Sequence, residues 1–259
     1  MTALEQIQLE CGSAVATFSV TSSSASSIRE LAQAFNTNST ESLNAIEIHA
    51  AFIQHCINCS EFGAALAVFD AFCQIYGTTT SDIHVVVQAL GLDEDAVRRV
   101  LRGYFSAWPI VAHLGVPSTT RPTTSTPALF ATDSLGLMAL FGGQRGTSSY
   151  LDEAERLFDV YRPLLIDFVS RMSSFLHRES QDKRISHVYS KGLDVLRWLT
   201  TSSAMPDEQY LLSIPVCLPL VGLIQLMHVM ILYKTLGISP GDLVKRFKGM
   251  LLSICSIGD

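Results

Sequence analysis

The chain has 259 residues, with 24 acidic and 18 basic side chains and a formal net charge of −6. The basic residues are scattered along the sequence, which excludes the concentrated positive charge that nucleic-acid-binding domains use. Hydrophobic residues make up 48% and charged residues 16%, so the chain has fewer charges than most free-standing soluble domains. The composition therefore implies either a large core or an apolar surface that a partner covers.

The N-terminus does not have the basic start of an export signal, because Met1 to Glu10 holds two acidic side chains and no basic one. We therefore expect a cytoplasmic protein with reduced cysteines. The segment Tyr210–Tyr233 contains no charged residue and is long enough to cross a bilayer. Pro215 and Pro219 interrupt its first part, so we expect a buried core helix from about Leu220 to Tyr233 and no membrane span.

Residues 1–115 are expected to form a mainly helical region. The first forty residues are weakly patterned, and the serine-rich run Ser22–Ser27 is typical of a loop. Helical periodicity begins near Thr40 and continues to Ile57. Further helices are predicted at Glu61–Tyr76, at Ile83–Leu90 and, after a capping Asp93, at Glu94–Phe105.

Residues 116–134 are predicted to be a linker, because Gly115 to Pro127 contains three prolines and many Ser and Thr residues. An apolar strand is predicted at Leu137–Phe141, and an amphipathic helix from Ser149 to about Leu176. Other helical patterns lie at Ile185–Leu199, Leu220–Tyr233 and Pro240–Phe247.

The apolar run Met250–Ile257 indicates a second strand, which we expect to pair in parallel with Leu137–Phe141 through Met250–Cys255. A parallel sheet of two strands is not a stable domain by itself. The predicted fold class is therefore α/β and predominantly helical, with an N-terminal helical block followed by an incomplete α/β domain over residues 135–259.

The best candidate site follows the first of these strands, where Gly142, Gly143 and Gln144 succeed Phe141. Glycines permit a tight turn and a close approach of backbone N–H groups to a ligand, as oxyanion stabilisation requires. By residue pattern alone, an ordinary strand-to-helix turn without a ligand is the simpler interpretation.

The pair Cys56-x-x-Cys59, preceded by His55, could bind zinc or act in redox chemistry. A structural zinc site needs four ligands and no second pair exists, so we expect buried free thiols and no metal.

His228, on an apolar helix, is predicted to be a packing histidine. Lys183-Arg184 and Lys245–Lys248 are most simply solvated helix faces, although the second cluster could contact an acidic carrier protein.

From Pro127 to Gly249 the chain resembles the N-terminal acetyltransferase (starter acyltransferase) domain of the fungal type I fatty acid synthase beta subunit. The resemblance extends to related beta subunits that make starter units for fungal polyketides. The matching segments are Leu140–Gln144 with Tyr150 and Tyr161, Gly192–Leu196 with Trp198-Leu199, Pro206-Asp207 with Tyr210–Pro215, Pro219–His228, and Leu236–Leu243.

The resemblance implies transfer of acetyl or short acyl groups from coenzyme A to acyl carrier protein, without a bound cofactor and with other synthase subunits as partners. It implies an oxyanion-hole role for Gln144, with Gly142 and Gly143 beside the substrate. Arg145 departs from the family, which has Gly directly after this Gln. A side chain at that position is expected to disturb the loop.

The family continues from its equivalent of Lys248-Gly249 into Gly-His-Ser-Gln-Gly, in which Ser is the nucleophile. Here Ile254 occupies that position, and the neighbouring Ser253, Cys255 and Ser256 do not have the flanking glycines. The family's catalytic His has no counterpart either. We therefore expect no transacylase activity from this chain alone. A non-catalytic assembly or interaction subunit of a synthase complex, and a truncated gene product, remain as alternatives.

Overall fold

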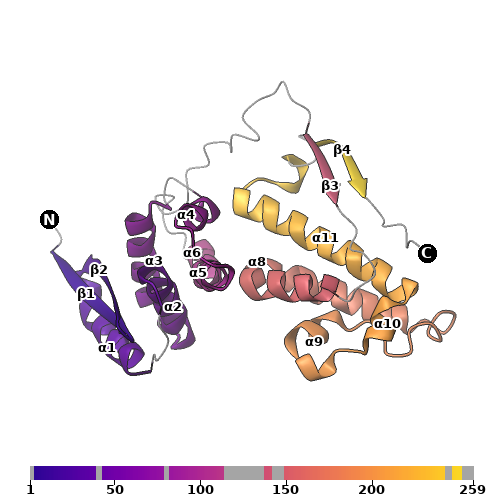
Figure 1. Ribbon diagram of the computed structural model, residues 1–259, viewed down its shortest axis with the longest axis horizontal. Coiled ribbons are helices and arrows are strands. Elements are labelled where there is room, and N and C mark those ends of the chain that lie inside the picture. Colours follow the sequence, from indigo (N-terminus) through magenta and orange to yellow (C-terminus); the bar gives the residue numbers. More distant parts are fainter. Residues whose placement is uncertain are drawn as a thin grey trace. The chain divides into compact units, whose positions relative to one another are not determined.

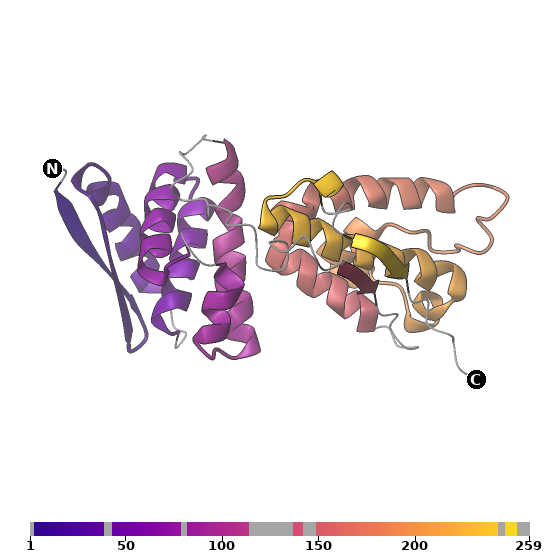
Figure 2. The ribbon, with the colours of Figure 1, turned by 90° about the horizontal axis from the view of Figure 1, so that it is seen from above.

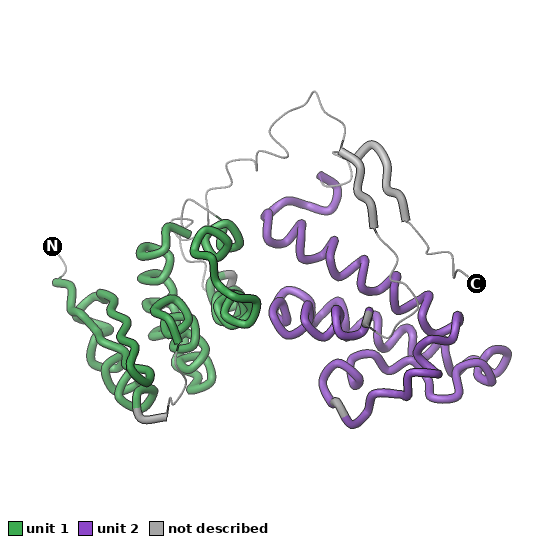
Figure 3. The backbone as a smooth tube through the Cα atoms, viewed as in Figure 1, with its two compact units in different colours: residues 1–125 green, residues 126–259 purple. Residues whose placement is uncertain are grey.

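The computed structural model describes residues 3–38, 43–78, 82–113, 137–141, 149–242 and 247–252. The chain divides into two compact units, Met1–Ser125 and Thr126–Asp259 (Figure 3). The described residues are mostly helical and include two sheets of two strands each, which confirms the predominantly helical α/β fold class (Figure 1). The predicted linker 116–134 lies outside the described residues.

The first unit begins with an antiparallel hairpin of β1 (Leu4–Cys11) and β2 (Ala14–Thr21), followed directly by α1 (Ser22–Asn38). Alternate strand residues such as Ile7, Leu9 and Phe18 are buried, and the hairpin forms an outer layer against the helices (Figures 1 and 2). The prediction of a loop at Ser22–Ser27 was wrong. Serine is a weak helix former, but Ala25, Ile28, Ala32 and Phe35 give α1 a buried face that outweighs its serine-rich first turns.

The remaining helices of the first unit confirm the prediction closely. They are α2 (Ala45–Asn58), α3 (Phe62–Tyr76), α4 (Ile83–Ala89), α5 (Glu94–Ser106) and α6 (Trp108–His113). Asp93 caps α5 as predicted, because its side chain accepts a hydrogen bond from the N–H of Ala96. The start of α2 was placed too early, since its cap is Asn44, which forms a capping box with Glu47.

Helices α2 and α5 approach each other closely. A Cβ atom on Gly103 of α5 would lie 2.4 Å from the backbone oxygen of Ala50 in α2. Nearby, the buried Glu47 carboxylate binds the Arg99 guanidinium, with N–O distances of 2.6 and 2.7 Å. The packing of these two helices therefore depends on a glycine and on one ion pair.

The second unit is built on α8 (Ser149–Ser180) and α11 (Ile214–Leu236), which pack along each other (Figure 1). Between them lie α9 (Val195–Thr200), the 3₁₀ turn η1 (Ser202–Ala204) and α10 (Glu208–Leu212). The first part of α8 is offset from the rest by a kink with non-helical φ and ψ at Tyr161, just before Pro163.

Helix α11 is longer than predicted. Pro215 is its second residue, where the missing N–H costs no helical hydrogen bond, and the helix continues through Pro219. By length and composition, α11 is the one helix among the described residues that could cross a membrane, a weak indication because core helices also pass this test. Its inner face is buried at Val216, Leu220 and Met227.

Two other predictions in the second unit were wrong in part. The segment Ile185–Leu199 is helical only from Val195, because residues 181–194 form turns and Asp194 caps α9. The segment Pro240–Phe247 is helical at 240–242, but Phe247 begins strand β4.

The second sheet pairs β3 (Leu137–Phe141) with β4 (Phe247–Leu252) in parallel. The parallel pairing confirms the prediction, although β4 begins three residues earlier than Met250. Residues 253–255, which were predicted to belong to this strand, lie outside the described residues.

Candidate functional site

The candidate oxyanion segment Gly142–Gln144 and the neighbouring Arg145 lie outside the described residues, as does Ile254. The structure does describe the elements that flank them. In the register of the parallel pair, Phe141 lies opposite Leu252, so both strands end at the same edge. Ligands in α/β folds bind at the carboxyl ends of parallel strands. In the sequence, Gly142–Gln144 come directly after Phe141, and Ile254 comes two positions after Leu252.

Helix α8 begins at Ser149, six positions after Gly143 in the sequence, and its first turn is fixed to the rest of the unit by Tyr150. The buried Tyr150 hydroxyl donates a hydrogen bond to the carbonyl oxygen of Leu211 at 2.7 Å. Burial raises the pKa of Tyr150, and the thiol of Cys217 adds to this effect. The phenol is therefore neutral, and its hydrogen bond joins the start of α8 to α10.

One turn further along α8, Glu153 bonds to His228 of α11, with 2.7 Å between Oε1 and Nε2. His228 is 44% exposed in its side chain, so the prediction of a packing histidine was wrong. A carboxylate that hydrogen-bonds to an imidazole nitrogen orients the ring. Among the described residues, Glu153 is the hydrogen-bond partner of His228, and no serine or cysteine hydrogen-bonds to this ring.

The Cys56-x-x-Cys59 pair is split between the interior and the surface. Cys56 is buried and Cys59 is exposed, with its Sγ 3.8 Å from Nε2 of His55. Burial raises the pKa of the Cys56 thiol to about 12, so this thiol is not a ready metal ligand or nucleophile. Within the described ranges, no three His, Cys, Asp or Glu side chains are grouped to hold a metal ion.

Lys183 and Arg184 do not form a helix face as predicted, because they lie in the turns between α8 and α9. Lys245 and Arg246 are outside the described residues. Sequence reasoning found the strand that leads to the candidate site but missed the Glu153–His228 pair. Nothing in the sequence around Glu153 indicates a partner 75 residues away.

No family model matches the chain. The fatty acid synthase subunit beta of Schizosaccharomyces pombe is 40% identical over 167 residues, which cover 64% of this chain and 8% of that protein. About two thirds of the chain is similar to part of fungal fatty acid synthase beta subunits.

The fatty acid synthase subunit beta of Saccharomyces cerevisiae is 36% identical over 181 residues, covering 65% of this chain and 8% of the relative. The fatty acid synthase beta subunit aflB of Emericella nidulans is 32% identical over 168 residues, which cover 65% of this chain and 8% of that protein. The beta-subunit similarity confirms the resemblance found in the sequence. The chain spans less than a tenth of the length of these relatives.

Proposed function

We propose that this chain is an N-terminal part of a fatty acid synthase beta subunit and carries half of an acyl-transfer site. In a complete domain this site transfers acetyl or short acyl groups from coenzyme A to acyl carrier protein. Gln144 donates a hydrogen bond to the oxyanion of the tetrahedral intermediate, and Gly142 and Gly143 let the backbone approach the thioester. The observation that carries this proposal is the common end of β3 and β4 at Phe141 and Leu252.

The proposal includes the domain boundaries 1–115, 116–134 and 135–259 for the helical region, the linker and the partial acyltransferase domain. The protein works in the cytoplasm with acyl carrier protein and other synthase subunits, and it binds acyl-coenzyme A as a substrate rather than as a resident cofactor. The 259-residue chain by itself has no transacylase activity, because no serine in it stands in a glycine-flanked elbow.

Incubation of the 259-residue chain with acetyl-coenzyme A, followed by intact-mass measurement, tests the inactivity. We expect an unmodified mass. An acetyl adduct that maps to Ser253, Cys255 or Ser256 would show that the chain has a nucleophile of its own.

The outer side of α11 favours a second candidate, a non-catalytic assembly subunit of a synthase complex. Ile214, Leu218 and Leu226 are 58%, 51% and 47% exposed on this helix, whose charged side chain, Lys234, lies in its last turn. Exposed apolar surface of this kind marks protein interfaces. Co-purification of the chain with a synthase subunit as a complex of uniform size, without acyl transfer, would support this function over the first.

A further inference from the structure

Residues 181–192, between α8 and α9, form a compact loop whose two ends meet. Gly192 has a φ of +67°, and a Cβ atom built on it would lie 3.3 Å from Nε2 of Gln181 and 3.4 Å from Nδ1 of His177. The backbone conformation therefore favours glycine, while the neighbouring side chains leave little room for a Cβ atom. A surface loop of this length with closed ends is an Ω-loop, a type that frequently carries function.

The loop is fixed to distant parts of the second unit. The buried hydroxyl of Tyr210 donates to the carbonyl oxygen of Gly192 at 2.7 Å, and the hydroxyl of Tyr189 donates to that of Pro215 at 3.2 Å. Inside the loop, the N–H groups of residues 185 and 186 donate to the carbonyl of Asp182. These bonds hold the backbone of the loop in place, which lowers the entropy cost of binding.

The loop displays basic and apolar side chains together. Lys183 and Arg184 are exposed, and Lys183 forms no ion pair with any residue that the structure describes. Ile185 and Val188 are 40% and 37% exposed. Residues 178–191 contain four basic and two acidic side chains, a net charge of +2 (4 − 2), whereas the whole chain has −6. Lys191 forms an ion pair with Asp207 outside this range, so the positive charge that remains is centred on Lys183 and Arg184.

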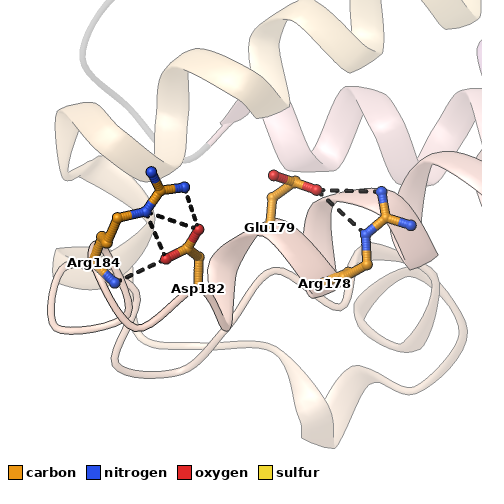
Figure 4. Close-up of polar contacts among 4 residues, drawn as sticks. All are labelled: Arg178, Glu179, Asp182 and Arg184. Atoms are coloured by element: carbon orange, nitrogen blue, oxygen red, sulfur yellow. Dashed lines mark hydrogen bonds and ion pairs between the residues drawn. The ribbon is translucent and has the colours of Figure 1, made fainter.

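Two exposed ion pairs orient the guanidinium groups of this region (Figure 4). Asp182 holds Arg184 through both carboxylate oxygens, at 2.6 to 3.2 Å, and Glu179 holds Arg178 at 3.2 and 3.3 Å. Exposed pairs such as these contribute little stability. Each guanidinium has five N–H donors, so both arginines keep donors for a further carboxylate or phosphate.

We propose that this loop is a docking surface for an acidic amphipathic helix of a partner protein. Carboxylates of the partner bind Lys183, Arg184 and Arg178, and its apolar side chains pack on Ile185 and Val188. The inference rests on the proposed function, which requires an acyl carrier protein as acceptor, and the carrier is the partner to which it commits. The positive loop on an acidic chain supplies the charge complementarity.

The test is a binding titration of the 259-residue chain with the fluorescently labelled acyl carrier domain of a fungal fatty acid synthase, followed by anisotropy. The double variant Lys183→Glu/Arg184→Glu reverses the charge of the loop. Arg197→Glu, at the exposed end of α9, makes the same kind of change outside the loop. We expect the double variant to raise Kd at least about tenfold and the control to change it less than about twofold, with weaker binding at high salt.

Ile185→Ser/Val188→Ser tests the apolar contact without a change of charge, and far-UV circular dichroism checks the folding of every variant. The proposal is overturned if the unmodified chain does not bind the carrier domain, or if Arg197→Glu weakens binding as much as the loop variant does. It is also overturned if the loop charges govern binding of adenosine 3′,5′-bisphosphate but not of the carrier domain. None of these results involves the nucleophile, so failure here leaves the acyl-transfer proposal standing.

Discussion

Gly103→Ala is expected to separate two helices of the first unit. The added methyl carbon would lie 2.4 Å from the oxygen and 2.8 Å from the Cβ atom of Ala50. Carbon atoms in contact prefer separations of about 3.5–4.0 Å, so α5 has to move by roughly 1 Å from α2. The obstacle is backbone rather than a flexible side chain, and α2 is itself packed against other elements of the unit.

The expected decrease in the free energy of unfolding is the cost of overpacking minus the gain in helix propensity. Overpacking a close contact costs about 3 kcal/mol at the upper end of the usual range, and alanine is favoured over glycine in a helix by about 1 kcal/mol. The free energy of unfolding should therefore fall by about 2 kcal/mol. For a unit of this size, that corresponds to a decrease in Tm of roughly 8 °C.

Urea unfolding of the full chain measures this loss. In a Trp198→Phe background, Trp108 reports on the first unit alone, because its ring lies beside Phe105 and Tyr104. Gly63→Ala in α3 is the matched control, since a Cβ atom there meets nothing within 4 Å. It should leave the unit as stable as before or slightly more stable. If Gly103→Ala changes the free energy of unfolding no more than Gly63→Ala does, the inferred close approach of α2 and α5 is contradicted.

Three further changes test the charged and strained positions. Burial lowers the pKa of His49 from 6.5 to about 4. The folded state therefore binds this proton only at a lower pH than the unfolded state does. The free energy of unfolding should fall by about 3 kcal/mol as the pH drops from 6.5 to 4. His49→Gln should remove that part of the pH dependence in urea titrations. Glu47→Ala should cost about 2 kcal/mol through the lost bonds to Arg99 and the helix cap, whereas Glu94→Ala at an exposed pair should cost under about 0.5 kcal/mol in the same assay. Gly192→Ala should lower the Tm of the second unit and increase cleavage of its loop by trypsin, and unchanged cleavage would contradict the closed loop.

Patterns that reflect local physics were predicted well. The cap at Asp93 before α5 was predicted from the sequence, because helix caps need particular residue types. The hairpin β1–β2 was missed even though buried and exposed residues alternate along it. Its polar outward positions made the segment look weakly patterned, and serines at the start of α1 hid a helix that packing stabilises.

Features that depend on distant parts of the chain could not be predicted. Nothing near His228 in the sequence points to Glu153, and nothing near Gly192 points to Tyr210. Pro215 was predicted to interrupt the helix, but it lies in the first turn of α11, where a proline is tolerated. For the candidate site, the sequence predicted the strand β3 and its parallel partner, while the roles of Gly142, Gly143 and Gln144 stay predictions.

The most direct test of the central claim is acetyl transfer in a chimera. Residues 250–259 are replaced by the segment that follows the matched region in the Schizosaccharomyces pombe beta subunit, where the family resemblance places the nucleophilic serine. Intact mass after incubation with acetyl-coenzyme A should show one acetyl group on the chimera, and Gln144→Ala should slow its appearance by roughly 100-fold or more. An acetylation rate that is the same with Gln144 and with alanine would contradict the account.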